Sequence, residues 1–274
     1  MVPQQGSAWE VELPGGLIDA SGRRLARAEL RPLTGAEEDW VATHPGIPNA
    51  AAVTGVLNAC LVRFDDSSVD RELVKRLLVG DRDYLMLQLR CITLGDQFRA
   101  VIHCPACSAK MDVDFAVHDI PIEPRPRASA MHTLERDGRT LQFRLPTGSD
   151  QEAVINLDLP DAIDALMGRC LIDDGGIPLT AEDRTAMIDA MDCLAPQVDV
   201  ELNLTCPECG HGFVTPFDTT AFFLDEMRLN GKRLLHETHL LAFYYHWGEA
   251  EILRLGRNRR RAYLALLSDE IKRD

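Results

Sequence analysis

Apolar residues recur at helical spacing through much of the first hundred positions. They follow a 3.6-residue period over residues 49–61 and again over 70–78, which predicts two helices that pack on each other. Gly80 interrupts the second pattern, and Asp81 is a suitable cap for a third helix. Thr34, which precedes acidic residues, predicts a short capped helix near the start of the chain. This part of the chain is therefore predicted to be mainly helical.

Strict alternation of apolar and polar residues replaces this period on both sides of two cysteine pairs. Residues 98–103 and 111–117 alternate around the first pair, and residues 198–204 and 212–217 surround the second. A period of two is typical of a half-buried strand. Each cysteine pair is therefore predicted to lie at the tip of a β-hairpin.

The segment between these hairpins mixes both patterns. Residues 134–141 predict a further hairpin around Asp137 and Gly138, because Asp-Gly is a preferred two-residue turn. Helices are predicted over residues 161–170 and after a capping box that begins at Thr180.

The order of these elements repeats along the chain. A helix that ends in Cys60 and Leu61 precedes the first cysteine hairpin, and a helix that ends in Cys170 and Leu171 precedes the second. Self-similarity of this kind indicates two pseudo-equivalent halves, each built from helices and a metal-bearing hairpin.

The fold class that follows is α+β. We expect helical segments plus two zinc-knuckle β-hairpins that come together as a zinc-ribbon-like unit, with a helical C-terminal tail. The expected divisions are an N-terminal segment (1–48), a first helical and zinc-knuckle half (49–130), a second half with its own hairpin, helices and zinc knuckle (131–217), and the helical tail (218–274).

The two cysteine pairs carry the clearest chemistry. Cys104, Cys107, Cys206 and Cys209 form two Cys-Pro-x-Cys turns, and Gly210 supplies the positive φ that such a turn requires. Two such turns supply the four thiolates of a structural zinc site and leave no open position for catalysis. Because the pairs lie about 100 residues apart, the site would join the two halves. Zinc binding would contribute on the order of 10 kcal/mol to folding.

Two other interpretations of these cysteines stay open. The pairs could be redox-active dithiols, since Cys-Pro-x-Cys also occurs at the head of a helix in thioredoxin-like folds. They could also form two separate metal sites that use His103 or His211 as additional ligands.

Composition narrows the possible partners and compartments. The net charge of -14 and the pI near 5.0 disfavour nucleic acid, because affinity for a phosphate backbone comes from Lys and Arg. The sequence has no apolar run long enough to span a membrane, and residues 1–22 lack the pattern of a secretory signal. We therefore expect a cytoplasmic protein whose eight cysteines serve metal binding or packing instead of disulfides.

No phosphate-binding loop, nucleophile elbow or kinase motif is present in the sequence, so we expect a protein that is not an enzyme. The strongest basic cluster comprises Arg257, Arg259, Arg260 and Arg261, beside Tyr263. A contact with an acidic protein surface is favoured there over nucleic acid because of the overall charge.

Several sequence motifs occur together in a characteristic order. They are LVGDRD (78–83), LQLR (87–90), GD (95–96), CPAC (104–107), RLPTGSD (144–150), CPEC (206–209), HLLAFYYHWGE (239–249), IL (252–253) and RRRAYL (259–264). Over about residues 33–267 the chain resembles the T-even-type phage baseplate proteins. This family is also described as baseplate hub assembly chaperones, of contractile phages and phage-tail-like contractile injection systems.

The resemblance implies a non-enzymatic structural or assembly protein that binds baseplate, hub or tape-measure components and can be incorporated in a phage-tail-like particle. On this interpretation the docking surface lies on the C-terminal helices, since aromatic residues and arginines dominate interface energetics. The residues concerned are Tyr244, Tyr245, Trp247, Arg257, Arg259, Arg260 and Arg261. The alternatives are a zinc-ribbon regulator that binds nucleic acid or transcription machinery, and a metal or redox enzyme.

Overall fold

The computed structural model describes residues 9–117, 120, 129–136, 138–174, 176, 178–198 and 200–273. Its strands are β1 (Trp9–Ile18), β2 (Arg24–Leu30), β3 (Leu61–Phe64), β4 (Gln97–His103), β5 (Lys110–Ala116), β6 (His132–Arg136), β7 (Arg139–Phe143), β8 (Leu171–Asp173), β9 (Glu201–Thr205) and β10 (Gly212–Pro216). Its helices are α1 (Gly35–Thr43), α2 (Asn49–Cys60), α3 (Arg71–Arg76), α4 (Val79–Leu94), α5 (Gly148–Val154), α6 (Leu159–Cys170), α7 (Ala181–Leu194), α8 (Thr219–Tyr245), α9 (Glu249–Leu253) and α10 (Arg257–Ile271). The predicted α+β class, with small hairpins and a helical tail, is confirmed.

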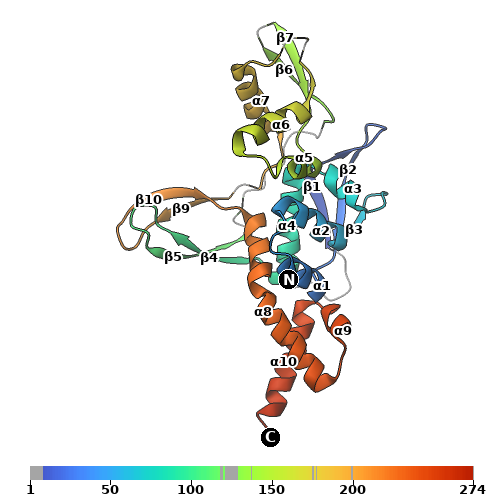
Figure 1. The fold of residues 1–274 in the computed structure, drawn as a ribbon, viewed down its shortest axis with the longest axis vertical. Coiled ribbons are helices and arrows are strands. Elements are labelled where there is room, and N and C mark those ends of the chain that lie inside the picture. Colours follow the sequence, from blue (N-terminus) through green and yellow to red (C-terminus); the bar gives the residue numbers. More distant parts are fainter. Residues whose placement is uncertain are drawn as a thin grey trace.

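Four parts make up the elongated molecule (Figure 1). A central body contains β1–β3 and α1–α4, and a lobe at one end contains β6–β8, α6 and α7. An arm made of the hairpins β4–β5 and β9–β10 projects to one side of the body. A tail made of α8, α9 and α10 runs away from the lobe and ends at the C-terminus.

The body is built around an antiparallel sheet of order β1-β2-β3. Its main apolar core joins this sheet to α2, α4 and the start of α8, and Leu30, Phe64, Leu85 and Phe223 are fully buried there. The sequence pattern did not predict β1 and β2. The register shifts between Glu12 and Leu17, and the Pro-Gly-Gly run inside this bulge masks the alternation that marks a strand.

The lobe repeats the sheet of the body. Its strands have the order β6-β7-β8, antiparallel throughout, and its last strand follows directly after a helix that ends in a buried cysteine, as β3 does. The backbone N–H of Arg31 donates to the carbonyl of Cys60 at 2.9 Å, and that of Arg144 donates to the carbonyl of Cys170 at the same distance. The predicted hairpin over 134–141 is present, although Asp137 lies outside the described residues.

A shared capping device follows the middle strand of each sheet. In the body, Glu37 accepts a hydrogen bond from Thr34 N at 2.8 Å and from an Arg31 guanidinium nitrogen at 2.7 Å. In the lobe, the corresponding carboxylate of Asp150 accepts from Thr147 N at 2.9 Å and from Arg144 at 2.6 Å. The body and the lobe therefore each start a helix from the motif Arg-x-x-Thr-Gly-x-acid, and the copy in the body lies within residues 31–37, which were expected to belong to a separate N-terminal segment (1–48).

Each of these Thr-Gly motifs is covered by a pair of helices from elsewhere in the chain. Gly148 N donates to the carbonyl of Leu77, between α3 and α4, at 3.1 Å, and Gly35 N donates to that of Leu255, between α9 and α10, at 3.1 Å. Residues 70–85 and 248–263 align without a gap on this basis. The alignment pairs Arg82 with Arg260, and both are fully buried.

One boundary differs from the sequence prediction. Gly80 and Asp81 do not separate two helices, because the chain extends at Leu77 and Leu78 and α4 already begins at Val79. Asp81 is not the cap of this helix. Its carboxylate reaches across to β1, where it accepts hydrogen bonds from Gly15 N at 2.8 Å and Gly16 N at 2.7 Å.

Candidate metal centre

The arm consists of two antiparallel hairpins, as the alternating pattern predicted. In the first, β4 pairs with β5 from Gln97 opposite Ala116 to His103 opposite Lys110. In the second, β9 pairs with β10 up to Thr205 opposite Gly212. Each ladder stops one residue before the first cysteine of a pair, so both cysteine turns lie at the outer end of the arm (Figure 1).

The two cysteine turns have the same backbone geometry. Cys104 N donates to the carbonyl of Ala109 and Cys206 N to that of His211, both at 2.9 Å. The residue four positions after each first cysteine has a positive φ, +60° at Ser108 and +72° at Gly210. Glycine is the residue expected for this conformation, and only the second turn has one.

The turns bring the four predicted cysteines to one point. The Sγ atoms of Cys104 and Cys209 lie 3.8 Å apart, and those of Cys107 and Cys206 lie 3.6 Å apart. All four sulfurs lie within 4.8 Å of one another. A tetrahedral thiolate site with metal–sulfur bonds of about 2.3 Å has sulfurs about 3.8 Å apart. The geometry therefore fits one metal ion held by both hairpins.

The four thiols lie so close together that the protonation state of each one affects the pKa of its neighbours. Burial alone would raise the pKa of the Cys104 thiol, but backbone N–H groups of Cys107 and Ala106 and neighbouring thiols lower it to about 7. The N–H of Ala109 lowers the pKa of Cys107, but the surrounding thiols outweigh it and raise that pKa to about 12. Because metal ligands must be thiolates, a bound cation would supply the charge that the fourfold cluster needs.

Neither histidine beside the turns belongs to the cluster. Among the described residues, the group of potential ligands at this point consists of the four cysteines, without His103 or His211. The cysteine turns also connect strands and do not begin helices. This arrangement favours a shared site over two separate sites and over the thioredoxin-like geometry.

An aromatic cluster fixes the base of the arm to the body. Phe98 of β4 stacks on Phe115 of β5 with ring centroids 4.8 Å apart, and Phe217 meets both rings edge-on. The guanidinium of Arg90, on α4, lies 3.7 Å above the ring of Phe98. The two hairpins are thus joined at their outer end by the cysteines and at their base by aromatic packing.

The predicted partner-binding residues of the tail have different surroundings. Tyr244 is 45% exposed, whereas Tyr245 and Trp247 are half-buried and stack on each other at 5.0 Å. Arg259 is exposed and donates to the hydroxyl of Tyr263 at 2.8 Å. Arg261 is exposed, and Arg257 is buried.

Arg260 requires a correction. It is fully buried, and its guanidinium donates to Glu38 at 2.8 Å and to Glu237 at 3.1 Å. These contacts hold α10 against α1 and α8, so the side chain is not available to a partner. Its acidic partner in α1 lies 222 positions away along the chain, and the local sequence contains no signal for such a pairing.

Further arginines lie near the tail cluster in space and were not singled out from the sequence. Arg99 of β4 and Arg233 of α8 line the same pocket as Arg257 and Arg261. These four arginines come from three separate elements, β4, α8 and α10, so no spacing along the chain could have grouped them. The described part of the chain contains no helix with the length and apolar character that crossing a bilayer requires.

Comparison with known proteins gives one family. The family model described as T4 bacteriophage base plate protein matches residues 26–224. This range contains both cysteine pairs, whereas the tail motifs at 239–264 lie beyond it. Neither the curated proteins nor the solved structures contain a match to the chain.

Proposed function

The chain belongs to the T4 bacteriophage base plate protein family, and from this premise we propose that it is a non-enzymatic structural or assembly protein of a contractile, phage-type tail. It acts by binding other baseplate, hub or tape-measure components and can be incorporated in the particle. The observation that carries this proposal is the family match over residues 26–224.

We propose that the metal is zinc and that its role is structural. Four thiolates in a tetrahedral arrangement suit zinc, and they leave no coordination position for a substrate. Because the sulfur contacts join residues 105 and 99 positions apart, the ion would hold the two hairpins in one arm. This would give the protein a rigid projection in an assembly without any redox or catalytic role for the cysteines.

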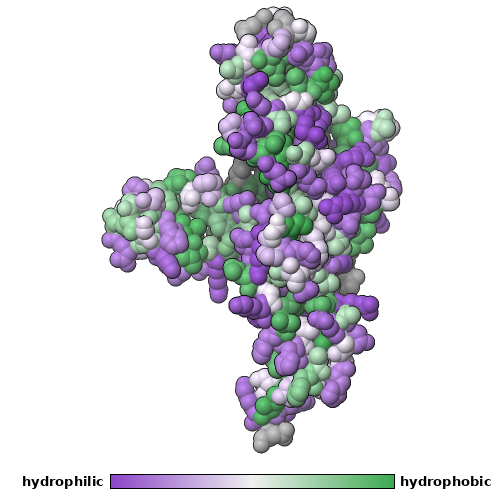
Figure 2. Space-filling view, in the orientation of Figure 1, coloured by the Kyte–Doolittle hydropathy of each residue, from purple (hydrophilic) through white to green (hydrophobic). Residues whose placement is uncertain are grey.

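The tail is the proposed docking surface. Tyr244, Arg259 and Arg261 are exposed there, and Tyr245 and Trp247 contribute the aromatic stack beneath them. Large apolar side chains are also exposed on α8 and α10, namely Leu229, Leu235, Phe243 and Leu266. Figure 2 shows apolar and polar residues interspersed over this end of the molecule. Such a mixture of aromatic, arginine and aliphatic groups is typical of a protein interface.

Affinity purification of the tagged, zinc-loaded protein from its native cells tests this function. Recovery of baseplate, hub or tape-measure proteins, identified by mass spectrometry, is the expected result. Tyr244→Ala combined with Arg261→Glu should reduce this recovery, because both side chains are exposed on the tail. Arg71→Glu makes the same charge change at an exposed position of the body and serves as the control.

Recovery of polymerase or nucleic acid without any tail protein would instead support the zinc-ribbon regulator. Binding to generic DNA that weakens steeply with salt would point the same way. If the variant with Tyr244→Ala and Arg261→Glu stayed folded and zinc-loaded and still recovered the same baseplate proteins, that result would refute the docking surface and leave the family role in place.

A further inference from the structure

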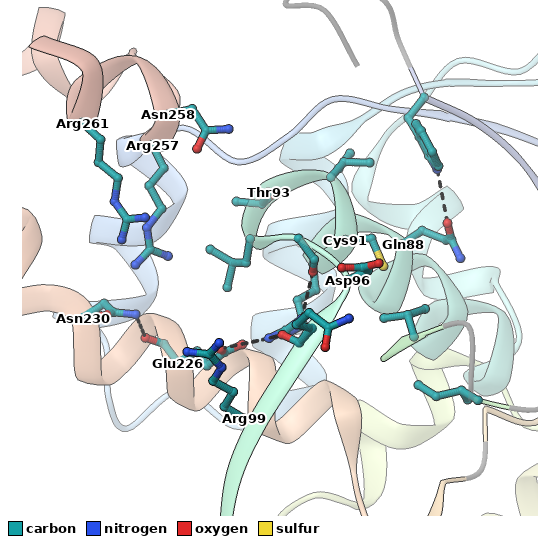
Figure 3. A pocket seen from close by; sticks show the side chains of 18 of the residues that line it. Gln88, Cys91, Thr93, Asp96, Arg99, Glu226, Asn230, Arg257, Asn258 and Arg261 are labelled. Carbon is teal, nitrogen blue, oxygen red and sulfur yellow. Dashed lines mark hydrogen bonds and ion pairs between the residues drawn. The ribbon is translucent and has the colours of Figure 1, made fainter. Parts of the chain in front are cut away.

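A pocket of about 1090 Å³ lies where the tail, the base of the arm and α4 meet. Among the described residues, its lining includes five arginines, Arg90, Arg99, Arg233, Arg257 and Arg261, and two carboxylates, those of Asp96 and Glu226. Figure 3 shows Arg257 and Arg261 pointing from α10 toward α8, with Arg99 on the arm side of the same space. This positive lining contrasts with the net charge of -14 for the whole chain.

The carboxylate of Glu226 is already engaged. It accepts hydrogen bonds from Arg90 at 2.8 and 3.2 Å, in a bidentate pair. Arg233 lies 3.7 Å from Glu237, and Arg99 lies 4.0 Å from Asp114 at the edge of ion-pair distance. Within the described residues, no ion pair joins Arg257 or Arg261 to an acidic group.

Arg257 is the most informative of these residues. It is only 8% exposed, yet no described residue offers its guanidinium a hydrogen bond or an ion pair, in contrast to the neighbouring Arg260. Its guanidinium nitrogens are not sealed off from solvent, so they face the water of the pocket. It is also the first residue of α10, where the helix dipole disfavours a positive charge. The side chain thus presents an unpaired cation to the pocket, where an anionic ligand would complete its surroundings.

The repeated helix pair shows that the fold itself does not need this arginine. In the alignment of 70–85 with 248–263, Arg257 corresponds to Val79 and Arg261 to Asp83. The residue that docks each pair on its Thr-Gly motif, Arg82 or Arg260, is the same in both copies. The tail copy therefore keeps the docking arginine and differs at the two positions that face the pocket.

We propose that this pocket binds a carboxylate from an acidic segment of a baseplate partner, with Arg257 as the central ligand and Arg261 and Arg99 beside it. The inference rests on the proposed function for the identity of the partner. Guanidinium groups bind carboxylates through paired N–H donors, and the free N–H groups at the start of α10 add to the attraction. The family match to a baseplate protein favours a carboxylate of a protein partner over the phosphates of a nucleic acid strand.

Binding of a fluorescein-labelled peptide of ten glutamates, followed by fluorescence anisotropy with the isolated zinc-loaded protein, tests the pocket without any baseplate partner. We expect saturable binding at low salt and a loss of affinity of about tenfold in Arg257→Val, the residue found in the other copy. The same substitution should not lower the melting temperature, because it removes a positive charge from the start of α10.

Arg71→Val is the matched control, since Arg71 is exposed on α3 and lies outside the pocket lining. It should change the peptide affinity less than about twofold, as expected for an exposed charge. Absence of peptide binding by the unmodified protein, or a lowered melting temperature of Arg257→Val with unchanged affinity, would overturn the proposal. If an unlabelled ten-nucleotide DNA strand displaced the labelled peptide in competition, the group that the pocket binds would be a phosphate instead of a carboxylate. Because no baseplate, hub or tape-measure protein is present in this assay, its outcomes are independent of the affinity purification.

Discussion

Substitution of Gly148 by alanine tests how the first helix pair docks on the lobe. A methyl group at Gly148 would lie 1.4 Å from Nη1 and 2.4 Å from Cζ of Arg82, so the guanidinium would have to leave its position. Arg82 is fully buried, and its Nη2 donates to the Ala50 carbonyl at 2.7 Å and to the Thr54 hydroxyl at 2.8 Å. There is no solvent-facing position into which the charge could move at low cost.

The expected magnitude follows from the two hydrogen bonds that would be lost. Hydrogen bonds of a charged donor contribute about 1.5–3 kcal/mol each, so we expect Gly148→Ala to lower the free energy of unfolding by about 3 kcal/mol or more. Gly168→Ala is the control, because no atom lies within 4 Å of the added methyl group in α6. Alanine is favoured over glycine in a helix by about 1 kcal/mol, so this variant should be slightly more stable.

Urea unfolding of the zinc-loaded protein, followed by far-UV circular dichroism, measures both variants. The cause of the loss is identified by adding Arg82→Met, which removes the colliding guanidinium. Gly148→Ala should then cost at least about 2 kcal/mol less than in the unmodified background. If Gly148→Ala were as stable as the parent, or equally harmful with and without Arg82, this account of helix-pair docking would be wrong.

Three further predictions concern charge and metal. Burial raises the pKa of Asp81 to about 6 from its ordinary 3.8, so its contribution to stability is present below pH 4 and is lost as the pH rises to 6. The stability of the parent relative to Asp81→Asn should therefore fall by about 3 kcal/mol between pH 4 and pH 7 in urea titrations, and a pH-independent difference would refute this. Arg260→Met leaves Glu38 buried without its partner and leaves Glu237 with Arg233 alone at 3.7 Å, and it should lower stability by about 3 kcal/mol, whereas a neutral effect in thermal unfolding would show that these ion pairs are not net contributors. Mass spectrometry should find one zinc ion per chain, and chelation or Cys209→Ser should destabilise the arm; full stability after metal removal, measured by thermal unfolding, would exclude a structural ion.

The features that the sequence predicted correctly are those encoded in short windows. Thr34 and Thr180 cap helices as expected, and the alternating residues on both sides of each cysteine pair form the hairpins of the arm. The pairing of the two cysteine turns was also predictable, because one Cys-x-x-Cys supplies only half of a tetrahedral site. In each case the local pattern and the tertiary structure require the same residues.

The features that were missed depend on residues distant in sequence. The β1–β2 hairpin is interrupted by a bulge, and Asp81 serves β1 instead of its own helix. Arg260 was grouped with the exposed arginines because its sequence neighbours are basic, yet its surroundings are set by α1 and α8. Periodicity cannot reveal these contacts, since a buried charge is identified only by the partner that neutralises it.

The repeated helix pair distinguishes residues that folding requires from residues that are proposed to bind a partner. Helices α3 and α4 cover the Thr-Gly motif of the lobe, and α9 and α10 cover that of the body. The covering requires a buried arginine in each pair, so Arg82 and Arg260 are constrained by folding. Position 257 carries no such constraint, since its counterpart is an apolar valine. The unpaired arginine there is what the proposed carboxylate pocket requires, and the same comparison separates Arg260, which docks a helix pair, from the arginines that are proposed to bind a partner.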